Sequence, residues 1–573
     1  MSDQPLDQRG GNRSQRPTSK AFRTFMAGQW AEPDALAPTR SPGAEFAAER
    51  RTRLAAQFPG ERLVIPAGTP PRRSNDTDYR FRPHSTFAHL TGLGTDEEPD
   101  AVLVLHPLAP ADDAVPSSPD TGASAASPTD DAVHTQPNIG LATGATPTTD
   151  HSVHTTTDAA APADAGRSAT HDPAATPPSP SHEAVLYIRP ASGKDTSEFY
   201  ADARYGEFWV GRRPTLAEIA TATGIRTEHL DSLRDALAKD AGPGAVALRV
   251  IRSADQAATE MVDEIRAQAG LPASSAPGGS TLSDDDALDE ATSELRLIKD
   301  VHEVAQLRLA VDATIRGFER VVQALPRAQG EDRGERVVEA AFEAGARIEG
   351  NGTGYDTIAA AGPHATTLHW TANTGRVRSG ELLLLDAGVE VDSLYTADIT
   401  RTIPVSGRYS PVQRRVWEAV VDAADAAFAA ARPGNRFREV HEAAMVVIAE
   451  RLAEWGLLPV GAAESLTPQG QQHRRWMVHG TSHHLGLDVH DCARARAELY
   501  LDGVLEPGMV FTIEPGIYFK LEDLAVPAEY RGIGARCEDD VLITADGNVN
   551  LSADLPRRAD AIEEWMARIW AGS

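Results

Sequence analysis

The sequence predicts a mixed α/β (α+β) protein with two folded domains. The chain has 573 residues, which is more than a single hydrophobic core usually organises. Short apolar runs of strand length alternate with segments of helical periodicity along most of the chain. Two polar, Pro- and Ser-rich stretches interrupt this alternation, at 109–182 and 271–293. We interpret the first as an insertion and the second as a linker between domains.

The first domain is expected over residues 43–270, after a flexible tail at 1–42 that contains a short helix near Lys20–Met26. Helical periodicity is visible at 49–58 and again at 214–240. Four short apolar runs bounded by turn residues predict buried strands at 62–68, 100–107, 183–190 and 245–252.

The stretch at 109–182 has no Phe, Trp or Tyr, and its only basic residue is Arg167. Such a segment cannot bury enough apolar surface to offset the entropy lost on ordering. The sequence therefore predicts a disordered acidic insertion between two neighbouring strands of the first domain, where a surface loop tolerates it at modest entropic cost.

The second domain is expected over residues 294–573. It opens with a strongly amphipathic helical segment at 294–325. Beyond it, helices and short strands alternate to about residue 555, and this part contains every candidate site residue.

Charge and cysteine content exclude several classes of function. The chain has 55 Lys plus Arg against 83 Asp plus Glu, a net charge of −28, which argues against nucleic-acid binding and against a polybasic membrane surface. Two cysteines cannot build a disulfide framework. The polar N-terminus lacks the apolar core of a signal peptide, and no apolar run is long enough to span a bilayer. A soluble cytoplasmic protein is expected.

Four carboxylates stand at strand ends or on strand faces in the second domain. Asp386 ends the buried run LLLL, and Asp398 opens an alternating segment twelve residues later. Two strands joined by a turn would set these carboxylates side by side, where both stay charged only with a cation or a shared proton. Glu514 ends VFTI, and Glu538 lies in GARCEDDV. Taken singly, each has an ordinary alternative as a turn residue, a strand-end charge or a salt-bridge partner.

Histidines concentrate in VHGTSHHLGLDVHD, residues 478–491. Spacing alone does not decide which of His479, His483 and His490 binds a ligand. His484 follows His483 directly and is expected to face away. His369, in TTLHWT, is on spacing alone no more than a residue at the edge of the core.

Arg536 shares a strand face with Glu538 by the two-residue pleat. It could steady a cluster of ligands, although a surface salt bridge is the simple alternative. Four carboxylates with one imidazole suit two hard divalent cations, such as Mn²⁺, better than a structural zinc site. Two such cations sharing a water supply a hydroxide nucleophile at neutral pH.

The ordered motifs DAG, DITRT, HGTSHHLGLDVHD, EPGIY and EDD resemble those of the pita-bread metallopeptidases, and among them aminopeptidase P, the Xaa-Pro aminopeptidases. The resemblance is strong over 295–555. It extends more weakly to 75–93 and 207–213, which are similar to the creatinase-like N-terminal domain of that family. It implies a pita-bread catalytic domain at 294–573 behind a creatinase-like domain.

The resemblance also implies roles for individual residues. The implied ligands of two divalent metal ions, with Mn²⁺ expected, are Asp386, Asp398, His483, Glu514 and Glu538. Glu514 would also exchange protons with the water between the metals. The implied catalytic residues are Glu514, His490, His369, His479 and Arg536. The implied substrate-binding residues are Tyr355, His369, His490 and Tyr518.

The implied activity is release of the N-terminal residue from peptides with proline in the second position. A prolidase, which cuts Xaa-Pro dipeptides, is the alternative within the class. A non-catalytic pita-bread protein that binds peptides is the alternative from another class, and a methionine aminopeptidase would leave the N-terminal region without a purpose. The family further implies a homo-oligomer, a dimer or a tetramer.

Overall fold

The computed structural model describes residues 17, 19–31, 39–75, 77–108, 181–272 and 283–572. All of these belong to one compact unit. The insertion predicted at 109–182 lies outside the described residues except for its last two, and His182 already begins a strand. Most of the predicted tail also lies outside them, but its expected short helix is present as α1, Lys20–Ala27.

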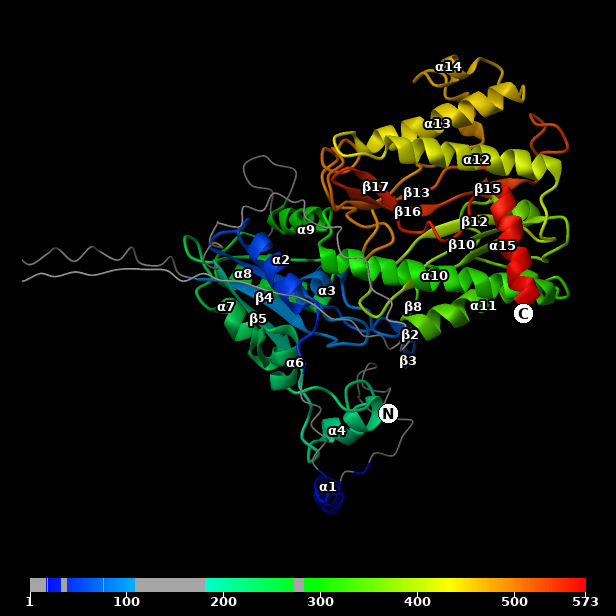
Figure 1. Cartoon of the computed structure of the whole chain (residues 1–573). Coiled ribbons are helices and arrows are strands. Elements are labelled where there is room, and N and C mark those ends of the chain that lie inside the picture. The colour runs from blue at the N-terminus through cyan, green and yellow to red at the C-terminus, as the bar shows by residue number, and fades with distance from the viewer. Residues whose placement is uncertain are drawn as a thin grey trace, which may run out of the picture. The chain divides into compact units, whose positions relative to one another are not determined.

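A five-stranded sheet forms the centre of the N-terminal part (Figure 1), in the order β6-β5-β4-β1-β7. Pairing is antiparallel in its middle and parallel at both edges. The four predicted strands are confirmed as β1, β4, β5 and β7. The strands are β1 Glu61–Pro66, β4 Val102–Pro107, β5 His182–Ile188, β6 Arg226–His229 and β7 Ala247–Val250.

Strand β6 lies inside the stretch 214–240 that the periodicity predicts to be helical, so that prediction is wrong for these residues. The helix that begins this stretch, α6, stops at Thr223 because Gly224 takes a left-handed conformation with φ 68°. The chain then runs parallel to β5 before helix α7 begins. The remaining elements are α2 Ala44–Ala55, β2 Arg72–Ser74, β3 Thr77–Asp78, α3 Ser85–Thr91, α4 Ser197–Ala201, α5 Glu207–Val210, α6 Leu216–Thr223, α7 Leu233–Ala238 and α8 Gln256–Gln268.

Helix α9, Asp284–Leu295, begins within the segment predicted to be a linker at 271–293. Ser283 starts it with a reciprocal capping box to Asp286. Its apolar face, which includes Leu288, packs into the core of the N-terminal sheet. The structure therefore differs from the predicted polar break. The helix expected at 294–325 begins as α10, Val301–Ala328, where Asp300 provides a new cap.

In the C-terminal part, short antiparallel strands lie between two pairs of helices (Figure 1). Helices α10 and α11, Gly334–Glu349, pack together, as do α12, Pro411–Ala430, and α13, Phe437–Glu454. The strands are β8 Gly352–Thr353, β9 Ile358–Ala361, β10 Leu382–Ala387, β11 Val389–Glu390, β12 Ile399–Pro404, β13 Val510–Ile513, β14 Gly516–Tyr518, β15 Gly534–Arg536, β16 Asp539–Thr544 and β17 Gly547–Asn550.

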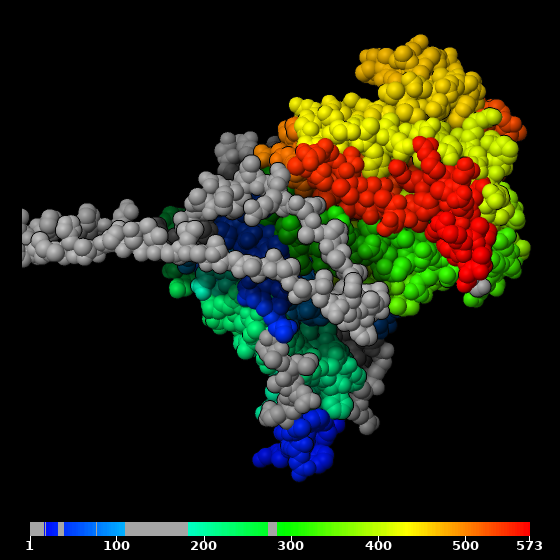
Figure 2. Space-filling view, in the orientation of Figure 1, coloured from blue at the N-terminus to red at the C-terminus, as the bar shows by residue number. Residues whose placement is uncertain are grey.

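The last helix closes this part from outside. Helix α15, Ala559–Gly572, packs against α10 and α12, and the Trp570 indole donates to the Val322 carbonyl over 2.8 Å. In Figure 2 the red C-terminal segment lies across the green and yellow surface. The short α14, Ala462–Ser465, packs on α13.

These observations confirm the mixed α/β (α+β) class. Both cysteines, Cys492 and Cys537, are free and buried. Among the described residues, no helix combines the length and apolar character needed to cross a membrane.

Candidate active site

Two paired strands bring the first two carboxylates together. Strand β10 runs antiparallel to β12, with Asp386 opposite Thr400, and Asp398 directly precedes β12. The Tyr355 hydroxyl lies 2.8 Å from Asp386 and also hydrogen-bonds Asp398. A Cβ on Gly388 would lie 1.6 Å from the Ala397 carbonyl oxygen, so the main chains abut at this point. The expected pair of neighbouring carboxylates is confirmed.

The other two carboxylates come from the second group of strands. Glu538 lies between β15 and β16, and its backbone N–H donates to the Thr400 carbonyl over 3.0 Å. The Thr400 hydroxyl donates to the Glu538 carboxylate over 2.7 Å. Glu514 follows β13, and its backbone N–H donates to the carbonyl of Thr481, in the histidine-rich segment, over 2.8 Å. Backbone hydrogen bonds therefore join Glu538 to β12 and Glu514 to the histidine-rich segment.

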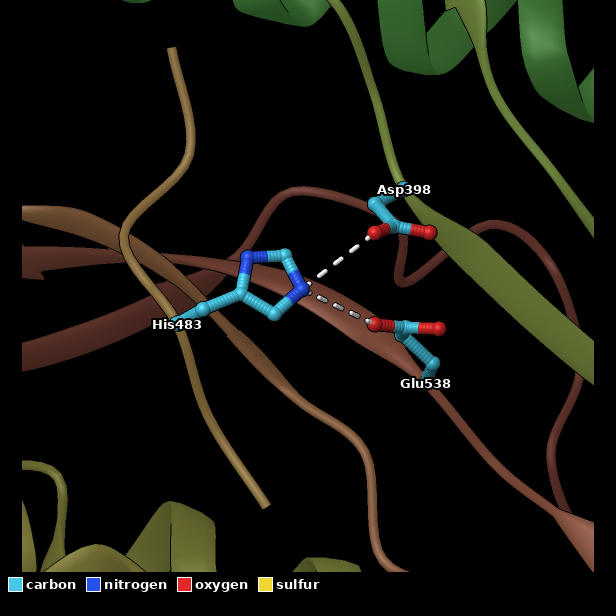
Figure 3. Close-up of side chains that lie close together, drawn as sticks. All are labelled: Asp398, His483 and Glu538. Carbon is cyan, nitrogen blue, oxygen red and sulfur yellow. Dashed lines mark ion pairs between the residues drawn. The ribbon is translucent and has the colours of Figure 1, made fainter. Parts of the chain in front are cut away.

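The His483 ring points one nitrogen toward the carboxylates of Asp398 and Glu538 (Figure 3). Its Nε2 is 3.3 Å from Asp398, 3.8 Å from Glu538 and 3.9 Å from Glu514. Ligand atoms of Asp398, His483 and Glu538 all lie within 4.8 Å of one another, a spacing that one metal ion can bridge. We call these three residues together with Asp386 and Glu514 the carboxylate cluster.

Burial and mutual repulsion dominate the electrostatics of the cluster. Burial raises the pKa of Glu514 to about 7, against the opposing effect of His483. Burial and the charges of Asp398 and Glu514 raise the pKa of Glu538 well above its usual value. Burial lowers the pKa of His483, but the hydrogen bond to Asp398 and the negative charges of Asp398 and Glu514 together outweigh burial and raise the pKa to about 8. The carboxylates exceed the neighbouring positive charge, and this oxygen-rich donor set with one imidazole fits hard divalent cations.

Arg536 supplies fixed positive charge at one side of the cluster. It is buried, pairs with Asp386, and donates to the hydroxyls of Tyr518 at 3.1 Å and Thr400 at 3.2 Å. Arg536 is buried and lines the cavity, so the alternative of an ordinary surface salt bridge is wrong. The other Asp386 oxygen accepts from the Tyr355 hydroxyl. Asp386 is not among the three residues whose ligand atoms lie within 4.8 Å of one another.

His479, near the start of the histidine-rich segment, continues this arrangement. Burial and Arg536 lower its pKa to about 3, so its ring is neutral. Its Nδ1 lies 2.5 Å from the Gly480 carbonyl, which can only accept a hydrogen bond, and 3.5 Å from the Glu514 carboxylate. The proton therefore resides on Nδ1, and Nε2 accepts from the Tyr518 hydroxyl over 2.8 Å.

One cavity of about 680 Å³ joins these groups. All predicted site residues line it except Tyr518, which lies behind His479. The His490 ring stands edge-on to that of His483 with centroids 4.4 Å apart. His369 reaches the cavity from a separate loop. Sequence reasoning did not identify an apolar part of the wall formed by Ile358, Leu368 and Val489.

Two supporting residues were also missed. Asp540 is fully buried and accepts the Asp398 backbone N–H over 3.2 Å. Thr400 bonds Glu538, as described above. Both lie inside motifs that the sequence displays, EDD and DITRT, and the pleat places Asp540 on the Glu538 side of the strand. His484 faces away as expected, since it is fully buried and stacks on Phe437.

Four carboxylates and imidazoles around a cavity, set on paired strands between two helix pairs, define a metal-dependent hydrolase. Comparison with known families supports this class. Residues 305–545 match metallopeptidase family M24, and residues 47–117 match the aminopeptidase P N-terminal domain.

Full-length relatives agree with these matches. The chain is 42% identical over 571 residues to Xaa-Pro aminopeptidase 1 of Streptomyces coelicolor, covering 99% of this chain and 96% of that protein. It is 42% identical to Xaa-Pro aminopeptidase 2 of the same organism, covering 96% and 97%. The low-pH form of Escherichia coli aminopeptidase P aligns with a TM-score of 0.68 and 27% identity, covering 92% and 99%. The chain therefore belongs to the Xaa-Pro aminopeptidases of metallopeptidase family M24.

Proposed function

We propose that this protein is a metal-dependent aminopeptidase that releases the N-terminal residue from peptides with proline in the second position. The observation that carries the proposal is the gathering of Asp398, His483 and Glu538 in one cavity with the histidines His369 and His490. Relatives that carry this activity in their names match the chain over nearly its whole length.

The carboxylate cluster would hold two divalent metal ions, for which we propose Mn²⁺. When bound, such ions supply Lewis acidity and lower the pKa of a water to near neutrality. Tyr355 and Arg536 orient Asp386 by hydrogen bonding, and Thr400 orients Glu538. These contacts restrict the ligand rotamers, as supporting hydrogen bonds commonly do at metal sites.

Proton transfer is proposed for Glu514. Its carboxylate lines the cavity between His483 and His479, where it can take a proton from the attacking water. It can then deliver that proton to the proline nitrogen, which must be protonated to leave. His479 is neutral and keeps the backbone of the histidine-rich segment in place through Gly480.

Substrate contact is proposed for His369 and His490. Burial lowers the pKa of His490, so its neutral ring offers one N–H to the carbonyl oxygen where negative charge develops. The apolar wall of Ile358, Leu368 and Val489 offers a surface for a pyrrolidine ring. An Xaa-Pro bond is a tertiary amide without an N–H, so recognition by shape suits it.

Prolidase activity is the alternative. The match to the aminopeptidase P N-terminal domain at 47–117 favours the aminopeptidase. The non-catalytic alternative is disfavoured because all five predicted ligands surround one cavity. The expected dimer or tetramer and the cytoplasmic location stay predictions.

Hydrolysis of an Xaa-Pro-Xaa tripeptide and of the matching Xaa-Pro dipeptide distinguishes these functions. We expect the chelator-treated protein to be inactive and to cleave the tripeptide after addition of Mn²⁺. Parallel additions of Co²⁺, Zn²⁺ and Mg²⁺ test the metal. Cleavage of the dipeptide alone would identify a prolidase, and inactivity with every metal would favour a binding protein.

A further inference from the structure

The loop between β9 and β10 contributes a separate wall of the cavity. Over 362–375 it contains Leu368, His369 and Thr371, all of which line the cavity. Apart from one short 3₁₀ turn at Gly362–Thr366, the loop has no regular secondary structure. Its side chains are therefore placed by tertiary contacts and not by a backbone ladder.

Glu335, in the first turn of α11, makes contacts along the whole loop. Its side chain is fully buried. One carboxylate oxygen accepts from the Ala361 backbone N–H at 2.9 Å and from His364 Nδ1 at 2.7 Å. The other accepts from Trp370 Nε1 at 2.9 Å and from the Gly375 backbone N–H. Ala361 directly precedes the loop, and the other three donors lie within it or at its end.

The middle of the loop is held most closely beside His369. The rings of His364 and Trp370 stack with centroids 3.9 Å apart and an interplanar angle of 25°. Both rings also hydrogen-bond Glu335. Stacking therefore restrains the face of the Trp370 ring, and the hydrogen bond restrains its Nε1 edge. Because Trp370 follows His369 in the chain, these contacts restrain the backbone that carries the His369 ring.

The packing around the carboxylate leaves little freedom. A Cβ on Gly375 would lie 2.7 Å from Glu335 Oε1 and 2.7 Å from the His364 ring. A second buried side chain, Asn373, fastens the same loop to β9, where it donates to the Thr357 carbonyl over 2.8 Å and accepts the Ala359 N–H over 3.0 Å.

We propose that Glu335 is a positioning residue for the reaction, which sets the place of His369 against the substrate by fastening the 362–375 loop along its length. The inference rests on the proposed function, because it takes His369 to contact the substrate. Glu335 itself lies behind the loop and touches none of the reacting groups.

A double-mutant cycle with Glu335→Gln and His369→Ala tests this. The amide has the volume of the carboxylate but turns an NH₂ group toward two N–H donors, so the loop must shift. We expect kcat on a Xaa-Pro tripeptide to fall about 10²-fold, with metal content and KM close to wild type. In the His369→Ala background, Glu335→Gln should change kcat by less than about threefold, because coupled residues are non-additive.

Two further variants keep the test decisive. Glu339→Gln, one turn along the same helix and half-buried, is the matched control and should retain wild-type kcat. Trp370→Phe removes one donor to Glu335 while keeping an aromatic ring against His364. It should lower kcat by a smaller factor, again only when His369 is present, and it replaces Glu335→Gln if that variant fails to fold.

A folded Glu335→Gln protein with wild-type kcat would overturn the inference, as would a full additive loss in the His369→Ala background. In both cases a reduced kcat of His369→Ala alone would leave the proposed role of His369 standing. Wild-type kcat in His369→Ala would overturn that role and the inference with it.

Discussion

Glu335 and the carboxylate cluster are buried acids within the same domain, but their surroundings differ. Glu335 accepts four N–H groups, and both of its oxygens are satisfied. Glu514 and Glu538 instead face other carboxylates, and burial raises the pKa of both. A buried carboxylate with enough donors builds structure, whereas a group short of positive charge marks a site for cations.

The largest effect that this comparison predicts is on activity. Glu538→Gln removes a charge from the centre of the cluster and should lower kcat/KM at least about a thousandfold, since several kcal/mol of stabilisation by the metals are at stake. Tripeptide hydrolysis and metal content per chain are the measurements. Glu506→Gln, an exposed glutamate outside the cavity, is the control. Unchanged activity in Glu538→Gln would remove that residue from the proposed ligands.

The second effect is on stability, and the two kinds of acid should respond with opposite signs. In chelator-treated protein, Glu335→Gln should lower the free energy of unfolding by about 2 kcal/mol or more, because buried donors lose their acceptors. Glu538→Gln should raise the Tm at neutral pH, because an amide avoids the cost of protonating on folding a carboxylate that burial and the charges of Asp398 and Glu514 disfavour in its ionised form. Thermal unfolding of both variants without metal is the measurement. A shift of both in the same direction would contradict the distinction.

The smallest effect concerns Asp523, a carboxylate that belongs neither to the carboxylate cluster nor to the loop held by Glu335. It accepts from Arg475 at 2.8 and 2.9 Å and from Trp476 at 2.9 Å. The bond from Arg475 holds the pKa of Asp523 well below its usual 3.8. Its stabilising contribution is therefore present above pH 3.8 and is lost as the pH falls through the lower, folded-state value. We expect Asp523→Asn to lower the Tm by a similar amount at pH 6 and pH 5, with the gap to wild type narrowing only below pH 3.8, at pH 3 and pH 2.5. A gap that does not change with pH would rule this out.

The cluster was predictable because each of its residues stands in a distinctive local sequence pattern. Asp386 and Glu514 each end an apolar run, where an acid is otherwise costly, and His483 lies among other histidines. When two strands are joined by a turn, the carboxylates at their adjoining ends lie side by side. The pairing of Asp386 with Asp398 could therefore be predicted without a structure. The roles of these residues in the reaction stay predictions.

Glu335 was not predictable by the same reasoning. It stands in the polar run GEDRGER, which is typical of a solvated helix start. Its donors come from the last residue of β9 and from the irregular loop after it, 26 to 40 residues further along the chain. Helix α9 was obscured in another way, since the polar composition before Asp284 concealed the capping box at Ser283 and the spacing of Leu288 and Leu295 on one face.

The close approach at Gly388 has a consequence for how the site tolerates change. Because its α-carbon lies against the Ala397 carbonyl, main-chain packing sets how closely the two segments that carry Asp386 and Asp398 approach each other. At Gly388 itself no side chain separates the two main chains, so no substitution there can bring them closer together. A single methyl group added at Gly388 would force apart the two segments that carry these acids.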